Sequence, residues 1–206
     1  MAEAQPKKPA AGDATKERIV NATLETIRSE GIVGTSARAI ARTGDFNQAL
    51  IFYHFGSIDN AVVAAVCELG TKRIAKHQAE LENATSLSEL IGIARAIHNE
   101  DTTSQNITVL AQVFARAARS DADDDLGAQL YAQLEPWNQM LAHAIERVAG
   151  DSPLVQFVPM AQLADAMSAL FVGIELLDDL DPSQGHADSL FDSMETLAEL
   201  VNSVLG

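Results

Sequence analysis

Side chains that can make directed hydrogen bonds gather between Ser36 and His54. The amide of Gln48 carries a donor and an acceptor, the pair that matches the edge of an adenine in the major groove of DNA. Tyr53 and His54 can each donate to a phosphate oxygen, a contact that positions a protein on DNA without reading its sequence. Ser36 can reach the DNA backbone in the same way, and the longer Arg38 can extend to a base edge. These residue types indicate a surface that binds nucleic acid.

Two short helices joined by a tight corner are predicted around these residues. Ser36 can cap the first helix by accepting the free backbone N–H groups of its opening turn. Gly44 and Asp45 suit the corner, because glycine tolerates left-handed backbone and aspartate tolerates it better than most residues. Asn47 can cap the second helix. This pattern predicts a helix-turn-helix, whose second helix enters the DNA major groove.

Base contacts in a helix-turn-helix concentrate at the start of its second helix. Gln48 and Ala49 fall there and Asn47 directly precedes them, so we expect these three residues at the DNA. Two alternatives stay open: Gln48 as a solvated surface residue, and His54 as a structural histidine with satisfied hydrogen bonds. We expect Phe52, between these polar residues, to pack in the core.

The segment from about Thr15 to Val66 resembles the DNA-binding domain of TetR-family transcriptional regulators. The resemblance is carried by TSARAIA at Thr35–Ala41, by the corner that follows it, and by FYHFGS at Phe52–Ser57. It implies an all-α homodimer in which three N-terminal helices bind a double-stranded operator and the later helices bind an effector and the partner subunit. The rest of the chain matches the family only in length, helical character and position.

The charge of the chain is distributed unevenly. The formal net charge is −15, which by itself disfavours binding to nucleic acid. Residues 1–56 hold seven Lys or Arg and six acids, whereas residues 57–206 hold seven basic and 23 acidic residues. This asymmetry fits a DNA-facing head on an acidic body, although acidic composition also simply keeps a protein soluble.

The pattern of breakers and apolar positions predicts an all-α chain in three parts. Residues 1–14 are small and polar and are expected to form a disordered arm. Residues 15–56 are expected to form the DNA-binding domain, and residues 57–206 the helical effector-binding and dimerisation domain. Breaks are expected at 83–86, 100–104, 120–125, 150–158 and 178–185, where Asp, Ser, Gly, Asn and Pro are frequent.

Apolar stripes on the last two predicted helices indicate a dimer interface. Such a stripe most often faces the core of its own subunit. In the TetR family, however, the corresponding helices form a four-helix bundle across a two-fold axis, so the resemblance favours a homodimer. The residues expected at that interface are Met167, Leu170, Ile174, Leu190, Met194 and Leu197.

Larger side chains in the body are candidates for an effector pocket, with ordinary core packing as the alternative. These candidates are His98, Phe114, Tyr131, Trp137, Met140 and Phe171. The acidic body favours a neutral or cationic, largely apolar effector, unless a local basic group such as Arg95 or Arg116 reverses that preference. A body that instead binds a protein partner is a second interpretation.

Other classes of protein find less support in the sequence. His77/Glu80 and His143/Glu146 each place two potential ligands on one helix face, but a metal-binding helical enzyme is disfavoured, since a di-iron bundle needs Glu-x-x-His and further inward glutamates. No catalytic or cofactor motif is present, so neither a cofactor nor a metal is expected. No apolar run reaches the roughly 18 residues of a membrane span. Cys67 as the single cysteine fits a cytoplasmic protein, and its apolar surroundings predict a buried thiol.

Overall fold

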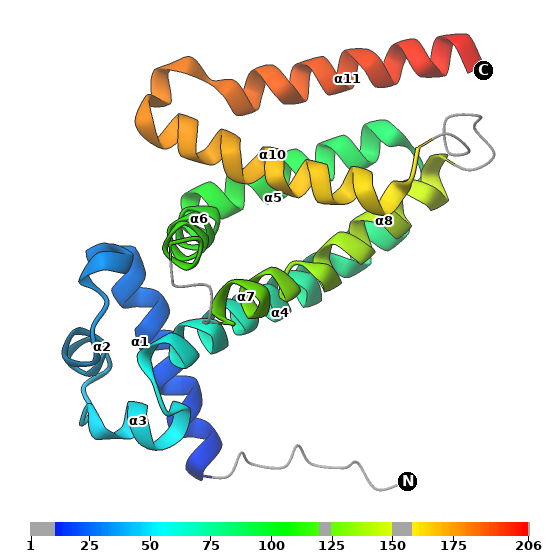
Figure 1. Ribbon diagram of the computed structural model, residues 1–206. Coiled ribbons are helices and arrows are strands. Elements are labelled where there is room, and N and C mark those ends of the chain that lie inside the picture. The colour runs from blue at the N-terminus through cyan, green and yellow to red at the C-terminus, as the bar shows by residue number, and fades with distance from the viewer. Residues whose placement is uncertain (1–10, 120–124, 150–157, 206) are drawn as a thin grey trace, which may run out of the picture. The chain divides into compact units, whose positions relative to one another are not determined.

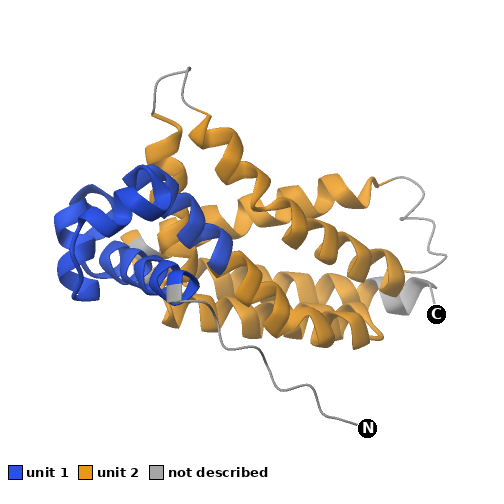
Figure 2. Ribbon diagram, turned by 90° about the horizontal axis from the view of Figure 1, so that it is seen from below, with its two compact units in different colours: residues 1–68 blue, residues 69–206 orange. Residues whose placement is uncertain are grey.

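The computed structural model describes residues 11–119, 125–149 and 158–205, and within these ranges it contains helices and no strand. The expected all-α fold is therefore confirmed. The chain divides into two compact units, Met1–Glu68 and Leu69–Gly206 (Figure 2). The division falls inside helix α4 (Ile58–Asn83) and not at residue 56, because Ile58 and Ala61 of that helix pack in the core of the first unit.

The first unit is built on α1 (Ala11–Gly34), α2 (Ala37–Gly44) and α3 (Ala49–Phe55), followed by the start of α4 (Figure 1). Gly31 interrupts α1 with φ 70° and ψ 168°, a conformation that glycine adopts without steric cost. The helix begins at Ala11, inside the segment expected to be a disordered arm; residues 1–10 of that arm lie outside the described residues. One buried cluster of the unit includes Ile19, Ala22, Ile40, Ile51 and Ala61.

Cys67 on α4 is exposed, so the predicted buried thiol is wrong. The helix turns Val62, Ala65 and Val66 inward, and all three are buried. At about 100° per residue, the position directly after Val66 points away from that buried face. An apolar run in the sequence does not by itself say which side of a helix is covered.

The second unit continues through α5 (Leu87–Thr103), α6 (Asn106–Ala117), α7 (Leu126–Ala132) and α8 (Glu135–Ala149). It ends with α10 (Met160–Leu180), a short 3₁₀ turn (Pro182–Gln184) and α11 (His186–Leu205). The breaks expected near 83–86 and 178–185 contain the ends of α4 and α10, whereas α5 continues through Thr103, so the break expected at 100–104 begins only at Ser104. The breaks expected at 120–125 and 150–158 lie almost entirely outside the described residues.

Buried clusters join the helices of the second unit. One joins the end of α4 to α5, α8 and α10, and includes Leu81, Leu141 and Ala164. Another joins α5, α10 and α11 around Phe191, which is 1% exposed. Helices α10 and α11 therefore pack on α5, and they lie side by side as an antiparallel pair (Figure 1).

The stretch Met160–Asp178 of α10 is long and apolar enough to cross a membrane, which the sequence did not lead us to expect. Its ionisable residues are nevertheless committed to contacts within the second unit. The carboxylate of Asp165 accepts a hydrogen bond from the Asn138 amide at 2.6 Å, and that of Glu175 accepts one from the Thr102 hydroxyl at 3.0 Å. Glu175 is only 2% exposed. These contacts join α10 to α8 and α5, as expected for a helix that packs inside a folded domain.

Candidate DNA-binding surface and effector cavity

The corner between α2 and α3 is held by local hydrogen bonds. The Ser36 hydroxyl accepts the N–H of Ala39 at 3.2 Å and caps α2 as predicted. Asp45 takes the left-handed conformation with φ 51° and ψ 56°, and its N–H and that of Phe46 return to carbonyls in the last turn of α2. These bonds satisfy carbonyls that would otherwise have no partner where the helix ends.

Gly44 serves the corner through its small size and not through its backbone freedom. A Cβ atom at this position would lie 2.2 Å from a ring carbon of Phe46 and 2.8 Å from the Cβ of Ala22. Glycine is therefore required because α1 and the Phe46 ring approach the backbone closely. Arg18 of α1 closes the corner from outside, since its Nε donates to the Gly44 carbonyl at 2.9 Å and its Nη2 donates to the Asp45 carbonyl.

Helix α3 presents its polar residues outward. The Asn47 side chain accepts the N–H of Ala49, the first residue of α3, at 2.9 Å, whereas Gln48 at the N-cap makes no side-chain cap bond. Gln48 and Ala49 stand exposed at the start of the helix. Tyr53 is 81% exposed, and its ring meets the His54 ring edge to face with 4.9 Å between centroids.

The same helix buries Ile51 completely, whereas Phe52 is 49% exposed, so the prediction that Phe52 packs in the core is wrong. Phe52 directly precedes Tyr53, and both side chains are exposed on α3. Ser36 and Arg38 at the start of α2 are also exposed. The surface formed by Ser36, Arg38, Asn47, Gln48, Ala49, Tyr53 and His54 is called the α2–α3 surface below.

Comparisons with known proteins show which protein family has this sequence and fold. No family model matches the chain. The HTH-type transcriptional repressor Rv3405c of Mycobacterium tuberculosis is 30% identical over 131 residues, which make up 60% of this chain and 69% of the relative. The crystal structure of a TetR-family regulator from Rhodococcus superposes with a TM-score of 0.72 at 17% identity, covering 92% of this chain and 98% of that one. The chain belongs to the TetR family of transcriptional regulators.

A TetR-family protein is a DNA-binding transcriptional regulator, and this function applies to the chain. A further structural neighbour, the multidrug binding protein EbrR complexed with imidazole, has a TM-score of 0.61 at 20% identity and covers 93% of this chain and 96% of that one. At such identities the two structural likenesses establish the fold alone. The fold matches over more than nine-tenths of this TetR-family chain, including the second unit that the sequence motifs do not reach.

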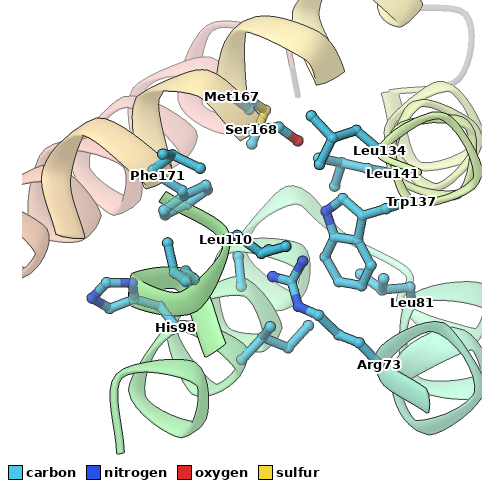
Figure 3. Close-up of a pocket in the computed structure, with 14 residues that line it drawn as sticks. Arg73, Leu81, His98, Leu110, Leu134, Trp137, Leu141, Met167, Ser168 and Phe171 are labelled. Atoms are coloured by element: carbon cyan, nitrogen blue, oxygen red, sulfur yellow. The ribbon is translucent and has the colours of Figure 1, made fainter. Parts of the chain in front are cut away.

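A cavity of about 60 Å³, called the inner cavity below, lies in the second unit of this TetR-family protein among α4, α5, α6, α8 and α10 (Figure 3). Three of the six residues predicted for an effector pocket line it: His98, Trp137 and Phe171. Phe114 and Tyr131 line an outer groove of about 450 Å³ beside it. Met140 lines a third, separate groove.

The inner cavity contains a basic residue that the sequence did not single out, Arg73 of α4. Its guanidinium carbon lies 3.6 Å from the centroid of the Trp137 ring, a cation–π contact. An Nη2 atom lies 2.8 Å from a carboxylate oxygen of Asp101, which is itself buried. Burial lowers the pKa of the Arg73 guanidinium although Asp101 opposes that change. Desolvation of the guanidinium therefore outweighs the stabilisation of its charged form by Asp101.

His98 contributes the side of its ring to the inner cavity and packs among aromatic rings. Its centroid lies 6.0 Å from that of Phe171 and 5.7 Å from that of Phe191. Its Nδ1 atom lies 3.9 Å from Glu175, too far for a hydrogen bond. Figure 3 shows the nitrogen atoms of His98 on the side turned away from Trp137. The ring therefore acts as an apolar wall of the cavity.

The six residues predicted at a dimer interface divide into two groups in the monomer. Leu170 is 46% exposed and Leu197 60% exposed, so these two are free to meet a partner. Ile174 is buried in the cluster around Phe191, and Leu190 and Met194 pack against that cluster. Met167 lines the inner cavity. The stripes are broad enough to serve the subunit's own core with one side and to leave leucines exposed on the other.

The two His-x-x-Glu pairs differ in their surroundings. The Nδ1 atom of His77 lies 3.2 Å from a carboxylate oxygen of Glu80, and the histidine is buried. His143 and Glu146 are both exposed. Across residues 11–119, 125–149 and 158–205, no three His, Cys, Asp or Glu side chains are grouped as a metal site would need. A carboxylate oxygen of Glu100 lies 3.8 Å from the Nε2 atom of His77, on the other ring nitrogen from Glu80.

Proposed function

We propose that the protein is a cytoplasmic repressor that binds a pseudo-palindromic operator as a homodimer and leaves it when a small molecule occupies the inner cavity. The observation that carries the DNA-binding part is the α2–α3 surface, where Gln48 and Tyr53 stand exposed on one short helix whose opposite side holds the buried Ile51. A two-fold dimer presents two such helices, so its half-sites are related by inversion and lie about one helical turn apart.

The homodimer is supported by apolar surface that the monomer leaves uncovered. Helices α10 and α11 expose a set of leucines: Leu170, Leu176, Leu177, Leu180, Leu197 and Leu200. Covering each such side chain contributes roughly 1.5–3 kcal/mol before the entropy of association is counted. A second copy brings the same leucines to a two-fold axis, as an isologous interface requires.

The effector response is supported by the inner cavity, which is apolar except for a few polar groups. Its volume of about 60 Å³ is small, so a ligand must displace side chains or extend into the outer groove of about 450 Å³. EbrR, a multidrug binding protein, shares this fold. Arg73 and Trp137 face the cavity from α4 and α8, and α4 also supplies core residues to the first unit.

Because the inner cavity is small, a second function stays possible, in which the second unit binds a protein partner and not a small molecule. The two are separated by measuring operator affinity with and without a small molecule. A ligand that lowers operator affinity must itself be bound more weakly by the same factor when DNA is present, typically about 5- to 150-fold. If compounds that bind the second unit never change operator affinity, the effector response is refuted and the protein-partner function is favoured.

Sedimentation of the protein with a duplex that carries its operator tests the dimer. We expect two protomers on each duplex, and a dimer at micromolar concentration without DNA. A monomer in both conditions contradicts the proposal.

A further inference from the structure

Two polar groups that face the inner cavity, the Arg73 guanidinium and the Trp137 indole, are donors of hydrogen bonds. The Arg73 guanidinium points toward the middle of the cavity, beneath the Trp137 ring (Figure 3). Its Nε atom is buried and has no hydrogen-bond partner among the described residues. The Trp137 indole nitrogen also faces the cavity in Figure 3, and indole N–H is a donor only. Ser168 adds a hydroxyl whose hydrogen is donated to the Asn138 side chain at 2.6 Å, so toward the cavity this oxygen can only accept.

Acidic groups near the cavity are occupied by other contacts. Asp101 pairs with Arg73 and also accepts from the Asn106 amide at 3.0 Å. Glu175 accepts from the Thr102 hydroxyl at 3.0 Å, and neither Glu175 nor Asp101 is a lining residue. The charged side chain that does line the cavity is the cation of Arg73. A cationic ligand would meet this guanidinium with no lining carboxylate to compensate it.

The inner cavity and the outer groove border on each other. Leu134, Ser168 and Val172 line both of them and form their common wall. Beyond this wall the groove is bounded by Phe114 and Tyr131, and Tyr131 is exposed at the protein surface. A long apolar group anchored at Arg73 would leave the small inner cavity along this path.

We infer that the effector is an amphipathic monocarboxylate, with its carboxylate against Arg73 and its apolar tail passing Leu134, Ser168 and Val172 into the outer groove. The carboxylate accepts from the guanidinium, a charge-assisted bond that is stronger than a bond between neutral groups. It also gives a partner to the buried Nε–H of Arg73, which has no hydrogen-bond partner among the described residues. The inference rests on the proposed effector response and reverses the preference for neutral or cationic ligands that the net charge of the body alone indicates.

Trp137 gives a direct measurement because it is the single tryptophan of the chain and stacks on Arg73. The probes are decanoate, 1-decanol and decyltrimethylammonium, which share a tail and differ in head group, titrated below their micelle concentrations into the full-length protein. Acetate supplies the carboxylate without the tail. We expect decanoate to change Trp137 fluorescence and to bind at least about 10-fold more tightly than each of the other three, as a charge-assisted bond and a buried tail require.

The variant that tests the anchor is Arg73→Met combined with Asp101→Asn, which removes both members of the buried pair and leaves no uncompensated charge. It should weaken decanoate by about 10- to 100-fold and leave 1-decanol unchanged. Arg95→Met is the matched control, because Arg95 also lies over an aromatic ring, that of Phe191 at 5.2 Å, and pairs with acids, but does not line the cavity. It should bind all four probes as the wild type does.

Three results overturn the inference. One is tighter binding of decyltrimethylammonium than of decanoate, which would leave the effector response standing with another ligand class. Another is a decanoate preference that survives in the double variant. Binding of none of the probes also refutes the carboxylate class, and an operator titration of the same sample then shows whether DNA binding stands. If decanoate binds as expected but leaves operator affinity unchanged, the ligand class holds and the effector response fails.

Discussion

The guanidinium of Arg18 donates a 2.9 Å hydrogen bond to the backbone carbonyl of Gly44, and so ties α1 to the corner between α2 and α3. The same side chain lies 5.5 Å from the ring centroid of Phe46. That ring in turn occupies the space that a side chain at position 44 would need. The direction of α3, and with it the α2–α3 surface, therefore depends on three residues that are not expected to contact DNA.

Gly44→Ala should destabilise the first unit by about 1–3 kcal/mol, because the added methyl group overlaps the Phe46 ring and Ala22. Operator affinity should fall with it. Gly92→Ala on α5 is the matched control, since a Cβ there meets nothing within 4 Å, and alanine favours a helix by up to about 1 kcal/mol. Denaturant unfolding measures both variants. Equal stability of the two would contradict the packing role of Gly44.

Local features of the first unit could be predicted from sequence. The cap at Ser36, the hydrogen bond of the Asn47 side chain to the start of α3 and the left-handed residue Asp45 depend on hydrogen bonds and backbone preferences within a few residues, which the sequence states directly. The role of Gly44 was only half predicted. Its place in the corner is local, whereas its contact with Ala22 of α1 is tertiary.

Features set by packing between helices were missed or misplaced. Phe52 and Cys67 sit in apolar runs, but which side of the helix is covered depends on neighbours that the run does not identify. Arg73 looks like an ordinary solvated residue, because nothing near it in sequence shows that Trp137 and Asp101 converge on it. Trp137 itself was a correct candidate for the cavity lining, since large aromatic side chains are frequent in pockets.

Gln48→Ala and Tyr53→Phe should weaken operator binding in different ways. Loss of the Gln48 amide removes a base contact, so preference at one position in each half-site should relax. Loss of the Tyr53 hydroxyl removes a phosphate contact, so all sequences should bind more weakly and to the same extent. Competition titrations with single-base operator variants measure both effects. Sequence preference unchanged in Gln48→Ala would show that this residue is only a solvated surface position.

Leu197→Glu should convert the dimer into monomers or aggregates and abolish operator binding. A carboxylate placed among exposed leucines of α10 and α11 would be buried without a partner in the dimer. Ala128→Glu adds the same charge at an exposed position on a different helix, α7, and should leave the dimer intact. Sedimentation velocity distinguishes the two variants. A Leu197→Glu protein that remains a dimer would place the interface elsewhere.

Glu89 should make the stability of α5 depend on pH. Its carboxylate accepts from the backbone N–H of Thr85 at 2.6 Å and from the Thr85 hydroxyl at 2.9 Å, and these bonds lower the pKa of Glu89 below its ordinary value of 4.5. The unfolded state therefore binds more protons near that pH, so the stabilisation is present above pH 4.5 and is lost as the pH falls through the lowered pKa. Glu89→Gln should flatten this part of the curve of unfolding free energy against pH. If the curves of the wild type and of Glu89→Gln stay parallel below pH 4.5, the hydrogen bonds from Thr85 to Glu89 do not have this stabilising role.

Selection of bound DNA from a random pool tests the central claim most directly, because it assumes neither an operator nor an effector. A homodimer that reads DNA with the α2–α3 surface should enrich two half-sites related by inversion, with centres about one helical turn or slightly more apart. The Gln48→Ala protein should recover the same symmetry with one degenerate position in each half-site. Enrichment of sequences without inverted symmetry, or no enrichment above the starting pool, would contradict the account.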